Sequence, residues 1–240
     1  MKFAKIFIVG LMLVVSQQVH GQLHLFGGVG GAYYQGDMYG AVLPTLKTTC
    51  FSWKVGVGYD FHRRWGVRAH YSKASVHGSD SYSDEAFAQA RAVTFTTKIT
   101  DIGVTAKYKH LFKKSYRFIN YGFFGFDYMN MNVARTDAGT GALVTEDAFG
   151  ATQWNVPVGI GLGWWFSAHW GGVFEGSYHY SFTDYLDGIS NAGNPKANDS
   201  YIDFHLMVVY RFGGGKGGKG RDGLFDPSDL NNVDCPRWGY

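Results

Sequence analysis

The chain has 240 residues, enough for one domain of ordinary size, and a formal net charge of only +3. Because Lys and Arg are dispersed along the sequence, no nucleic-acid partner is expected, and two Cys residues exclude a disulfide-stapled scaffold. The contents of Gly (34), Phe (19), Tyr (16) and Trp (7) are high, which suits a small membrane β-barrel: Gly relieves crowding on the inner wall, and Tyr and Trp favour the membrane–water interface.

The first 21 residues are predicted to form a cleavable signal peptide. Two Lys residues precede an apolar stretch at 6–15, which is too short to cross a bilayer as a helix, and small residues follow near position 21. Gln22 is therefore the expected start of the mature chain. No Cys follows the apolar stretch closely, so we expect an exported protein without a lipoprotein anchor.

Alternating apolar and polar residues predict eight strands in the mature chain. The clearest stretch, 201–212, alternates along nearly its whole length and ends on an aromatic residue. The expected strands span 23–34, 50–61, 65–77, 95–111, 117–133, 154–166, 170–185 and 200–212.

The predicted connections alternate sharply in length. Three are short, at 62–64, 112–116 and 167–169, and four are long and polar, at 35–49, 78–94, 134–153 and 186–199. Outer-membrane barrels have short turns on the periplasmic side and long loops on the extracellular side. An even number of strands would place both chain ends in the periplasm.

The alternation also predicts which side chains face lipid. In the second strand, Phe51, Trp53 and Val55 would face outward, with Ser52 and Lys54 inside. The first and fifth predicted strands are ambiguous, because Gly or aromatic residues occupy both faces. A soluble sandwich is the weaker alternative, since the strands are few, long and aromatic. We predict an all-β fold, an eight-stranded antiparallel transmembrane barrel over 22–212 in the outer membrane.

Charged residues are predicted inside this barrel. An eight-stranded barrel has room only for side chains, and enclosed opposite charges are expected to pair because an unpaired buried charge is costly. We interpret the enclosed charges as a structural network that fills the lumen, in preference to a transport or proton-relay pathway. The network comprises Lys54, Arg68, Lys107 and Arg211 with Asp60, Asp101, Glu175 and Asp203.

The pattern stops after Phe212. Residues 213–220 read as a flexible Gly/Lys linker, and the remaining tail to Tyr240 is too short for a folded peptidoglycan-binding domain. Its Leu224, Phe225 and Trp238 are anchors of the kind that become ordered on a partner surface.

Few residue groups suggest chemistry. The glycines at 27–31 lack the Lys of a phosphate loop, and the Asp-rich run at 226–234 lacks the Gly and Glu of a calcium loop, so neither cofactor nor metal is expected. His70 with Ser72, and His179 with Ser181, share inward faces, but a pair at i and i+2 does not establish a nucleophile, and we expect no enzyme. Cys50 and Cys235 are predicted at opposite ends of the barrel and would not bridge.

Four short stretches together resemble outer-membrane barrels of the PorG type, which are associated with type IX secretion and gliding machinery. They are GGAYYQGD at 30–37, FTDYLD at 182–187, YRF at 210–212 and the Cys-Pro pair at 235–236. The resemblance spans most of the mature chain, and the stretches at 183–187 and 235–236 are its most specific parts.

This resemblance implies a structural function: the barrel would anchor periplasmic ring or lipoprotein subunits of a secretion machine to the outer membrane. The expected partner contacts are Phe225, Cys235, Arg237, Trp238 and Tyr240 in the tail, and Arg63, Arg64, Lys113 and Lys114 in the periplasmic turns. Two alternatives stay open. One is a surface barrel of the OmpX type acting through its extracellular loops, and the other is an outer-membrane lipid-modifying enzyme.

Overall fold

A computed structural model describes the strands and most of their short turns. The described residues are 22–35, 48–62, 64–80, 93–111, 117–137, 143–144, 152–182, 186 and 199–212. The predicted signal peptide and the predicted tail from 213 onward lie outside these residues.

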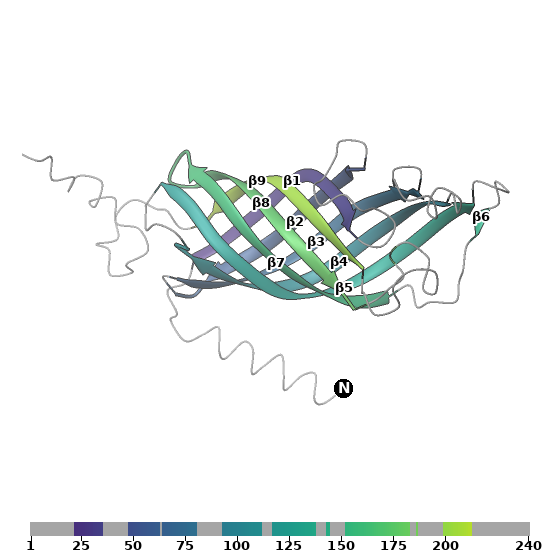
Figure 1. Ribbon diagram of the computed structural model, residues 1–240. Helices are drawn as coiled ribbons and strands as arrows, with labels where there is room; N and C mark the ends of the chain where they lie inside the picture. Colours follow the sequence, from purple (N-terminus) through teal and green to yellow (C-terminus); the bar gives the residue numbers. More distant parts are fainter. Residues whose placement is uncertain are drawn as a thin grey trace, which may run out of the picture.

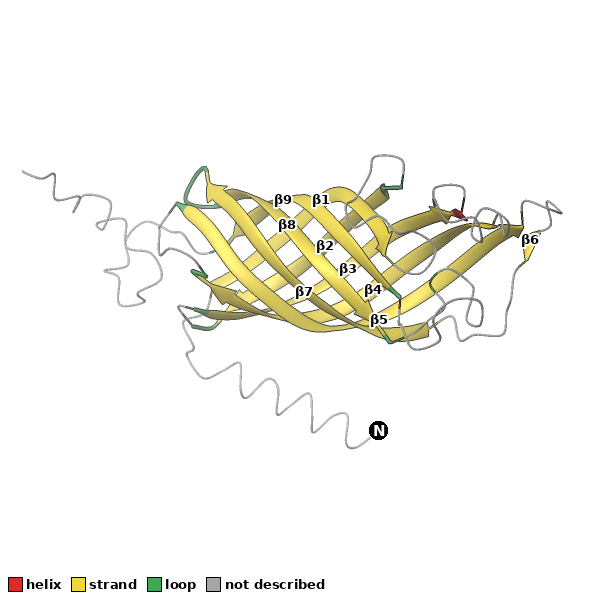
Figure 2. Ribbon diagram, viewed as in Figure 1, coloured by secondary structure: helices red, strands yellow, loops and turns green. Residues whose placement is uncertain are grey.

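The described chain is a closed antiparallel barrel of eight long strands (Figures 1 and 2). Pairing runs β4-β3-β2-β1-β9-β8-β7-β5, and β5 pairs with β4 to close the cylinder. The strands are β1 (Gln22–Gln35), β2 (Cys50–Asp60), β3 (Trp65–Ser79), β4 (Val93–Lys109), β5 (Phe118–Asp137), β7 (Thr152–Trp165), β8 (Trp170–Ser181) and β9 (Ser200–Arg211), and a short β6 (Leu143–Val144) pairs with the end of β5.

The predicted fold class is confirmed, and the strands differ from the predicted ones mainly at the ends with the long connections. β5 continues to Asp137, four residues beyond the expected limit of 133, because β4 also begins earlier, and Val93 pairs with Asp137. β6 lies within the predicted loop at 134–153. β8 ends at Ser181, whereas the alternation had suggested 185.

The two ends of the barrel differ. At the short-turn end, which we define by the connections 61–64, 110–117 and 166–169, the His62 amide donates to the Trp65 carbonyl at 3.1 Å. His110, with a φ of 60°, occupies the left-handed region and donates its amide to the Asn120 carbonyl at 2.8 Å. The first and last strands also meet here, because the Phe212 amide donates to the Leu23 carbonyl at 3.0 Å. The opposite end is called the long-connection end.

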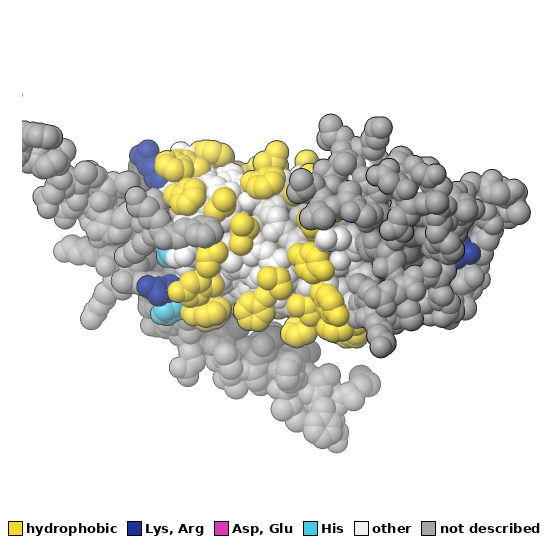
Figure 3. Space-filling model, in the orientation of Figure 1, with side chains coloured by type: hydrophobic (Ala, Val, Ile, Leu, Met, Phe, Trp, Pro, Cys, Tyr) yellow, Lys and Arg dark blue, Asp and Glu magenta, His cyan; other side chains and the backbone are white. Residues whose placement is uncertain are grey.

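The described outer wall carries many exposed apolar side chains (Figure 3). Exposed Val104, Leu206, Phe124, Phe126 and Phe174 cover its middle. Further exposed aromatic residues lie toward the two ends, and these include every exposed Trp: Trp65, Trp164, Phe166, Trp170 and Phe212 toward the short-turn end, and Phe51, Tyr128, Trp154, Tyr180 and Phe182 toward the other. Aromatic belts at two levels are typical of the two interfaces of a bilayer.

Within the described residues, no helix has the length and hydropathy needed to cross a membrane.

The inner wall carries two apolar clusters separated by polar side chains. The cluster near the short-turn end contains Phe26, Tyr121, Phe123, Val173, Met207 and Val209. The cluster near the long-connection end contains Ala32, Tyr34, Ala74, Val76, Val93, Phe95, Ile99, Met129, Met131, Leu186 and Tyr201. These clusters settle the two ambiguous strands, because β1 turns Phe26 inward and β5 turns Tyr121 and Phe123 inward.

Candidate functional site

Four charged side chains meet between the apolar clusters and form what we call the lumen charge cluster: Lys54, Arg68, Glu175 and Asp203. The Lys54 ammonium lies 3.5 Å from Glu175 Oε1 and 3.3 Å from Asp203 Oδ2. Arg68 Nη1 lies 2.6 Å from Glu175 Oε2. Their side chains are at most 4% exposed, so each charge depends on the others for compensation.

Arg68 is surrounded by partners on several strands. Its Nε donates to Thr105 Oγ1 at 3.2 Å, and its guanidinium carbon lies 4.4 Å from the ring centroid of Phe123. The Tyr121 hydroxyl donates to Glu175 Oε2 at 2.6 Å. Arg68 therefore joins the charge cluster to the apolar cluster at the short-turn end, and together they fill this part of the lumen.

A second polar layer lies toward the long-connection end. His179 is wholly buried, with Nε2 3.2 Å from Asp203 Oδ2 and its ring stacked on Tyr201 at a centroid distance of 4.2 Å. Tyr201 donates its hydroxyl to Asp101 Oδ2 at 2.7 Å, and Asn155 donates to Asp101 Oδ1 at 3.2 Å. Asp101 was expected to face a cation, but it instead accepts hydrogen bonds from two neutral groups.

Asp127 lies in the same layer between two histidines. Its Oδ1 is 3.4 Å from His70 Nε2, and its Oδ2 is 3.7 Å from His179 Nδ1. The neighbouring strand β4 makes room for this carboxylate with Gly103, the register partner of Asp127, where a Cβ would collide with Asp127 Oδ1. The close approach explains why a side chain is missing at this inward position.

Three residues near this layer form a Ser–His–Asp chain of contacts like that of a hydrolytic triad. Ser52 Oγ lies 3.0 Å from His205 Nε2, and His205 Nδ1 lies 3.7 Å from Asp203 Oδ2. All three are at most 2% exposed, and the apolar clusters lie above and below them. A nucleophile must reach a substrate carbonyl, so this arrangement fits a packed polar network better than an active site. The predicted pairs at His70 and His179 are likewise part of the packed lumen.

A third group of charges lies near the short-turn end. Asp60 is 2.9 Å from the Lys107 ammonium and 3.1 Å from that of Lys109, and Lys107 is also 3.1 Å from His24 Nε2. Arg211 is buried nearby and donates from Nη2 to the Ala168 carbonyl at 2.6 Å. Arg211 thus contacts the backbone of the turn between β7 and β8.

The long-connection end is closed by a residue from the connection between β8 and β9. Leu186 is fully buried in the apolar cluster there. Its amide donates to Asp199 Oδ2 at 2.9 Å, and its carbonyl accepts from Thr97 Oγ1 at 2.5 Å. Asp199 also accepts from the Tyr34 hydroxyl at 2.5 Å, so two strands and one connection are joined at this mouth.

The structure brings together six of the eight predicted lumen charges in ion pairs, in two groups: Lys54, Arg68, Glu175 and Asp203 in one, and Asp60 with Lys107 in the other. Sequence reasoning missed Tyr201 of β9, and it missed Asp127 and Tyr121, which lie on the fifth predicted strand, where alternation did not assign the faces. It also did not identify the partners that these residues reach across the lumen.

The predicted partner contacts are mostly outside the described residues. Arg63, Lys113 and Lys114 lie there, as do Phe225, Cys235, Arg237, Trp238 and Tyr240 in the tail. Arg64 is described and exposed, and it donates from Nη1 to the Tyr108 hydroxyl at 3.1 Å. Among the described residues, no group of three or more His, Cys, Asp or Glu side chains is placed to hold a metal ion.

Comparison with known proteins gives a family match and several similar structures. The family model described as outer membrane protein beta-barrel domain matches residues 6–212. Neisserial surface protein A is 13% identical, with a TM-score of 0.48, over 79% of this chain and 97% of that one. A major outer membrane protein from Thermus thermophilus is 15% identical, with a TM-score of 0.49, over 80% and 99%. OprG from Pseudomonas aeruginosa is 12% identical, with a TM-score of 0.46, over 80% and 96%. No curated protein matches the chain.

Proposed function

Because the chain belongs to the outer membrane protein beta-barrel domain family, and so is a barrel of the outer membrane whose wall contacts lipid, we propose that it is a sealed, non-enzymatic anchor. The anchor holds a periplasmic partner at its short-turn end.

The filled lumen is the observation that carries this proposal. Two apolar clusters and the lumen charge cluster occupy the space inside the strands, with Leu186 buried at one mouth and Arg211 near the other. A barrel filled in this way offers no water-filled path for a solute or a folded protein. Its function therefore depends on the surfaces at its two ends.

The short-turn end has the charge expected of a docking surface for an acidic partner. Arg64 and Arg117 are exposed there, and Lys, Arg and His side chains gather at this end (Figure 3). The three short connections contain no Asp or Glu in the sequence, whereas they include Arg63, Lys113 and Lys114. One sign of charge on a surface steers and orients partners of the opposite sign.

The identity of the partner is suggested by the resemblance to PorG-type barrels. In that case the short-turn end and residues 213–240 face the periplasm and bind ring or lipoprotein subunits of a type IX-like secretion machine. Both chain ends are expected on that side, since Gln22 and Phe212 lie together at the short-turn end, where Gln22 Nε2 is 3.5 Å from the Phe212 carbonyl.

Affinity purification from detergent-solubilised membranes tests the proposal. Deletion of residues 213–240, or the double substitution Arg64→Glu and Arg117→Glu, should leave the barrel folded in the membrane but abolish co-purification of periplasmic subunits. Charge reversal of Lys98, which is exposed on β4 away from this end, is the control and should keep the partners. Unchanged partners in both test variants would refute an anchor at the short-turn end.

One observation favours a second candidate, a surface barrel that acts through its long connections. β5 continues to Asp137, past its last pairing with β7 at Asn130, and β3 and β4 extend beside it. These three strands extend beyond the exposed aromatic residues at the long-connection end, and this extension carries polar side chains such as Thr96 and Lys98. Shortening the connections 81–92 and 138–151 should then abolish the function, while deletion of the tail should not.

A further inference from the structure

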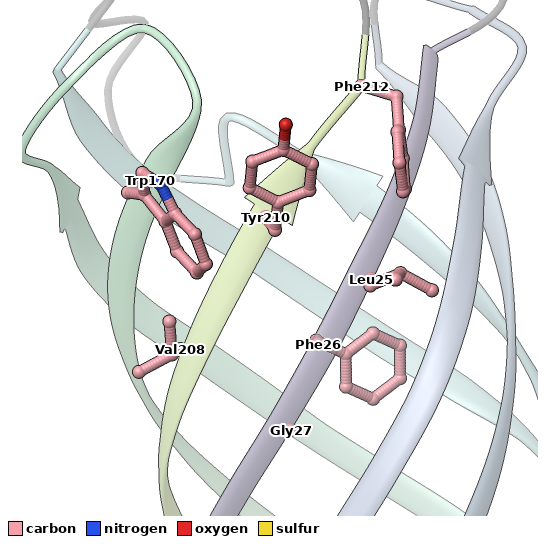
Figure 4. A pocket seen from close by; sticks show the side chains of 7 residues that line it. All are labelled: Leu25, Phe26, Gly27, Trp170, Val208, Tyr210 and Phe212. Carbon is pink, nitrogen blue, oxygen red and sulfur yellow. The ribbon is translucent and has the colours of Figure 1, made fainter.

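The outer wall has an apolar groove near the short-turn end, where the first and last strands meet. It is lined by Leu25, Gly27, Trp170, Val208, Tyr210 and Phe212, from β1, β8, β9 and the residue after β9, together with Phe26, whose ring is buried in the lumen (Figure 4). It is shallow, with a volume of about 490 Å³. The groove is open on the side that faces the membrane.

A missing side chain creates the groove. Gly27 occupies an outward position in β1 and lies between Val55 of β2 and Val208 of β9 in the strand register. The next outward residues along β1 are Leu25 on one side of Gly27 and Val29 on the other, and their side chains are 46% and 56% exposed. The wall is therefore recessed at Gly27, where a Cβ would lie 3.3 Å from Val55 Cγ1, and the backbone of β1 forms the floor of the recess.

Aromatic rings fix the wall of the groove on the side of the short-turn end. The rings of Trp170 and Tyr210 are 4.7 Å apart, and those of Tyr210 and Phe212 meet edge to face at 5.0 Å. The His169 ring also stacks on Tyr210, at a centroid distance of 6.0 Å. These contacts hold the rings in place, so the groove does not depend on one mobile side chain.

Polar atoms are found only at one end of the groove. The Tyr210 hydroxyl points toward the end of the barrel where Phe212 lies, and the Trp170 indole nitrogen lies on the same side of its ring (Figure 4). Gly27 and Val208, deeper along the wall, offer no polar side-chain atom. A ligand that fits must have an apolar chain and a polar group at one end of it.

We propose that this groove is a specific site for one acyl chain of a glycerophospholipid, with the ester region beside Tyr210 and Trp170. The groove is continuous with a wall that already contacts lipid, so its occupant comes from the bilayer. Lipid chains are as apolar as the wall, and selectivity therefore depends on packing: a chain in the groove fills a space that would otherwise lack contacts. The choice of a glycerophospholipid rests on the proposed orientation, which places this end in the inner leaflet.

Native mass spectrometry of the full chain, purified in detergent with a defined glycerophospholipid, tests the site. The barrel should retain phospholipid, and Gly27→Leu or Val208→Phe, which fill the groove, should remove roughly one retained lipid per barrel. Gly122→Leu and Val104→Phe are matched controls on other strands; Val104 is exposed, and a Cβ at Gly122 would have no contact closer than 3.6 Å. The controls should retain the lipid.

Three outcomes would overturn the proposal. The first is equal lipid retention by the filled variants and the unmodified protein. The second is retention of lipid A in place of glycerophospholipid when both are supplied. The third is a gain of bound lipid after deletion of residues 213–240, which would identify the tail as the occupant. None of these results depends on co-purification of a periplasmic partner, so the anchor proposal can fail while the lipid site stands.

Discussion

Arg68 of β3 and Glu175 of β8 meet across the lumen, with Arg68 Nη1 2.6 Å from Glu175 Oε2, although their strands are not neighbours in the barrel. The pair joins opposite parts of the wall through its centre. Because Glu175 also approaches Lys54, one carboxylate compensates two cations. Hydrogen bonds between paired strands stabilise the barrel around its circumference, and the Arg68–Glu175 ion pair links opposite walls through the lumen.

Removal of both partners should destabilise the barrel by less than the sum of the two single removals. Glu175→Leu alone leaves Arg68 buried without its carboxylate, and Arg68→Leu alone leaves Glu175 with only Lys54, so each should cost about 3–5 kcal/mol in unfolding free energy. The double variant leaves Lys54 with Asp203 and should lose less than the sum of the single losses. Urea unfolding in lipid bilayers measures these values. Strictly additive losses would show that the two groups do not interact.

Substitution of Ala for Gly should destabilise the barrel at an inward position but not at an outward one. A Cβ at Gly103 would collide with Asp127 Oδ1, whereas a Cβ at Gly176 would have no atom within 4 Å. Gly103→Ala is expected to cost about 1–3 kcal/mol or to prevent folding, and Gly176→Ala should be neutral or slightly stabilising. Folding yield into vesicles and urea midpoints compare the two variants. Equal tolerance of both substitutions would contradict the close packing around Asp127.

Much of the fold could be predicted because many strands separate apolar and polar residues cleanly. In β9 the inward series includes Asp203 and His205, and the outward series includes Leu206 and Val208, so period two fixes both faces. The three short turns then fix three of the strand pairs, β2–β3, β4–β5 and β7–β8, since each joins antiparallel neighbours.

There is a physical reason why alternation did not separate the inward from the outward side chains of the first and fifth predicted strands. Alternation separates the two faces only where the interior is polar, but this lumen also contains apolar clusters, so Phe26 and Phe123 point inward while Leu25 and Phe124 point outward. Both faces of a strand are then apolar, and alternation carries no information. The partners of Asp127 were also beyond prediction, because contacts across the lumen depend on the tilt and stagger of strands distant in sequence.

Leu186 should be the main anchor of the connection between β8 and β9. Leu186→Ala removes buried contacts with the apolar cluster at the mouth and should cost about 2–5 kcal/mol, while Leu206→Ala, on the exposed outer wall, should cost much less. Trypsin cleavage at Lys196 in folded protein provides a second measurement. Cleavage should become faster in Leu186→Ala, and an unchanged rate would show that the connection is held by other contacts.

A charged substitution on the outer wall should destabilise the barrel more near the bilayer midplane than near the interface. Val104 is 58% exposed and lies in the apolar middle of β4, whereas Phe61 is 45% exposed just beyond β2 at the short-turn end. An Arg near the midplane must carry its charge through hydrocarbon, so Val104→Arg should cost about 2–4 kcal/mol, and Phe61→Arg, near the interface, about 0–1 kcal/mol. Unfolding in bilayers measures both. If Phe61→Arg proves the more costly, the membrane lies at a different height on the barrel than the two aromatic belts indicate, and the lipid groove near the short-turn end would then lie outside the interface.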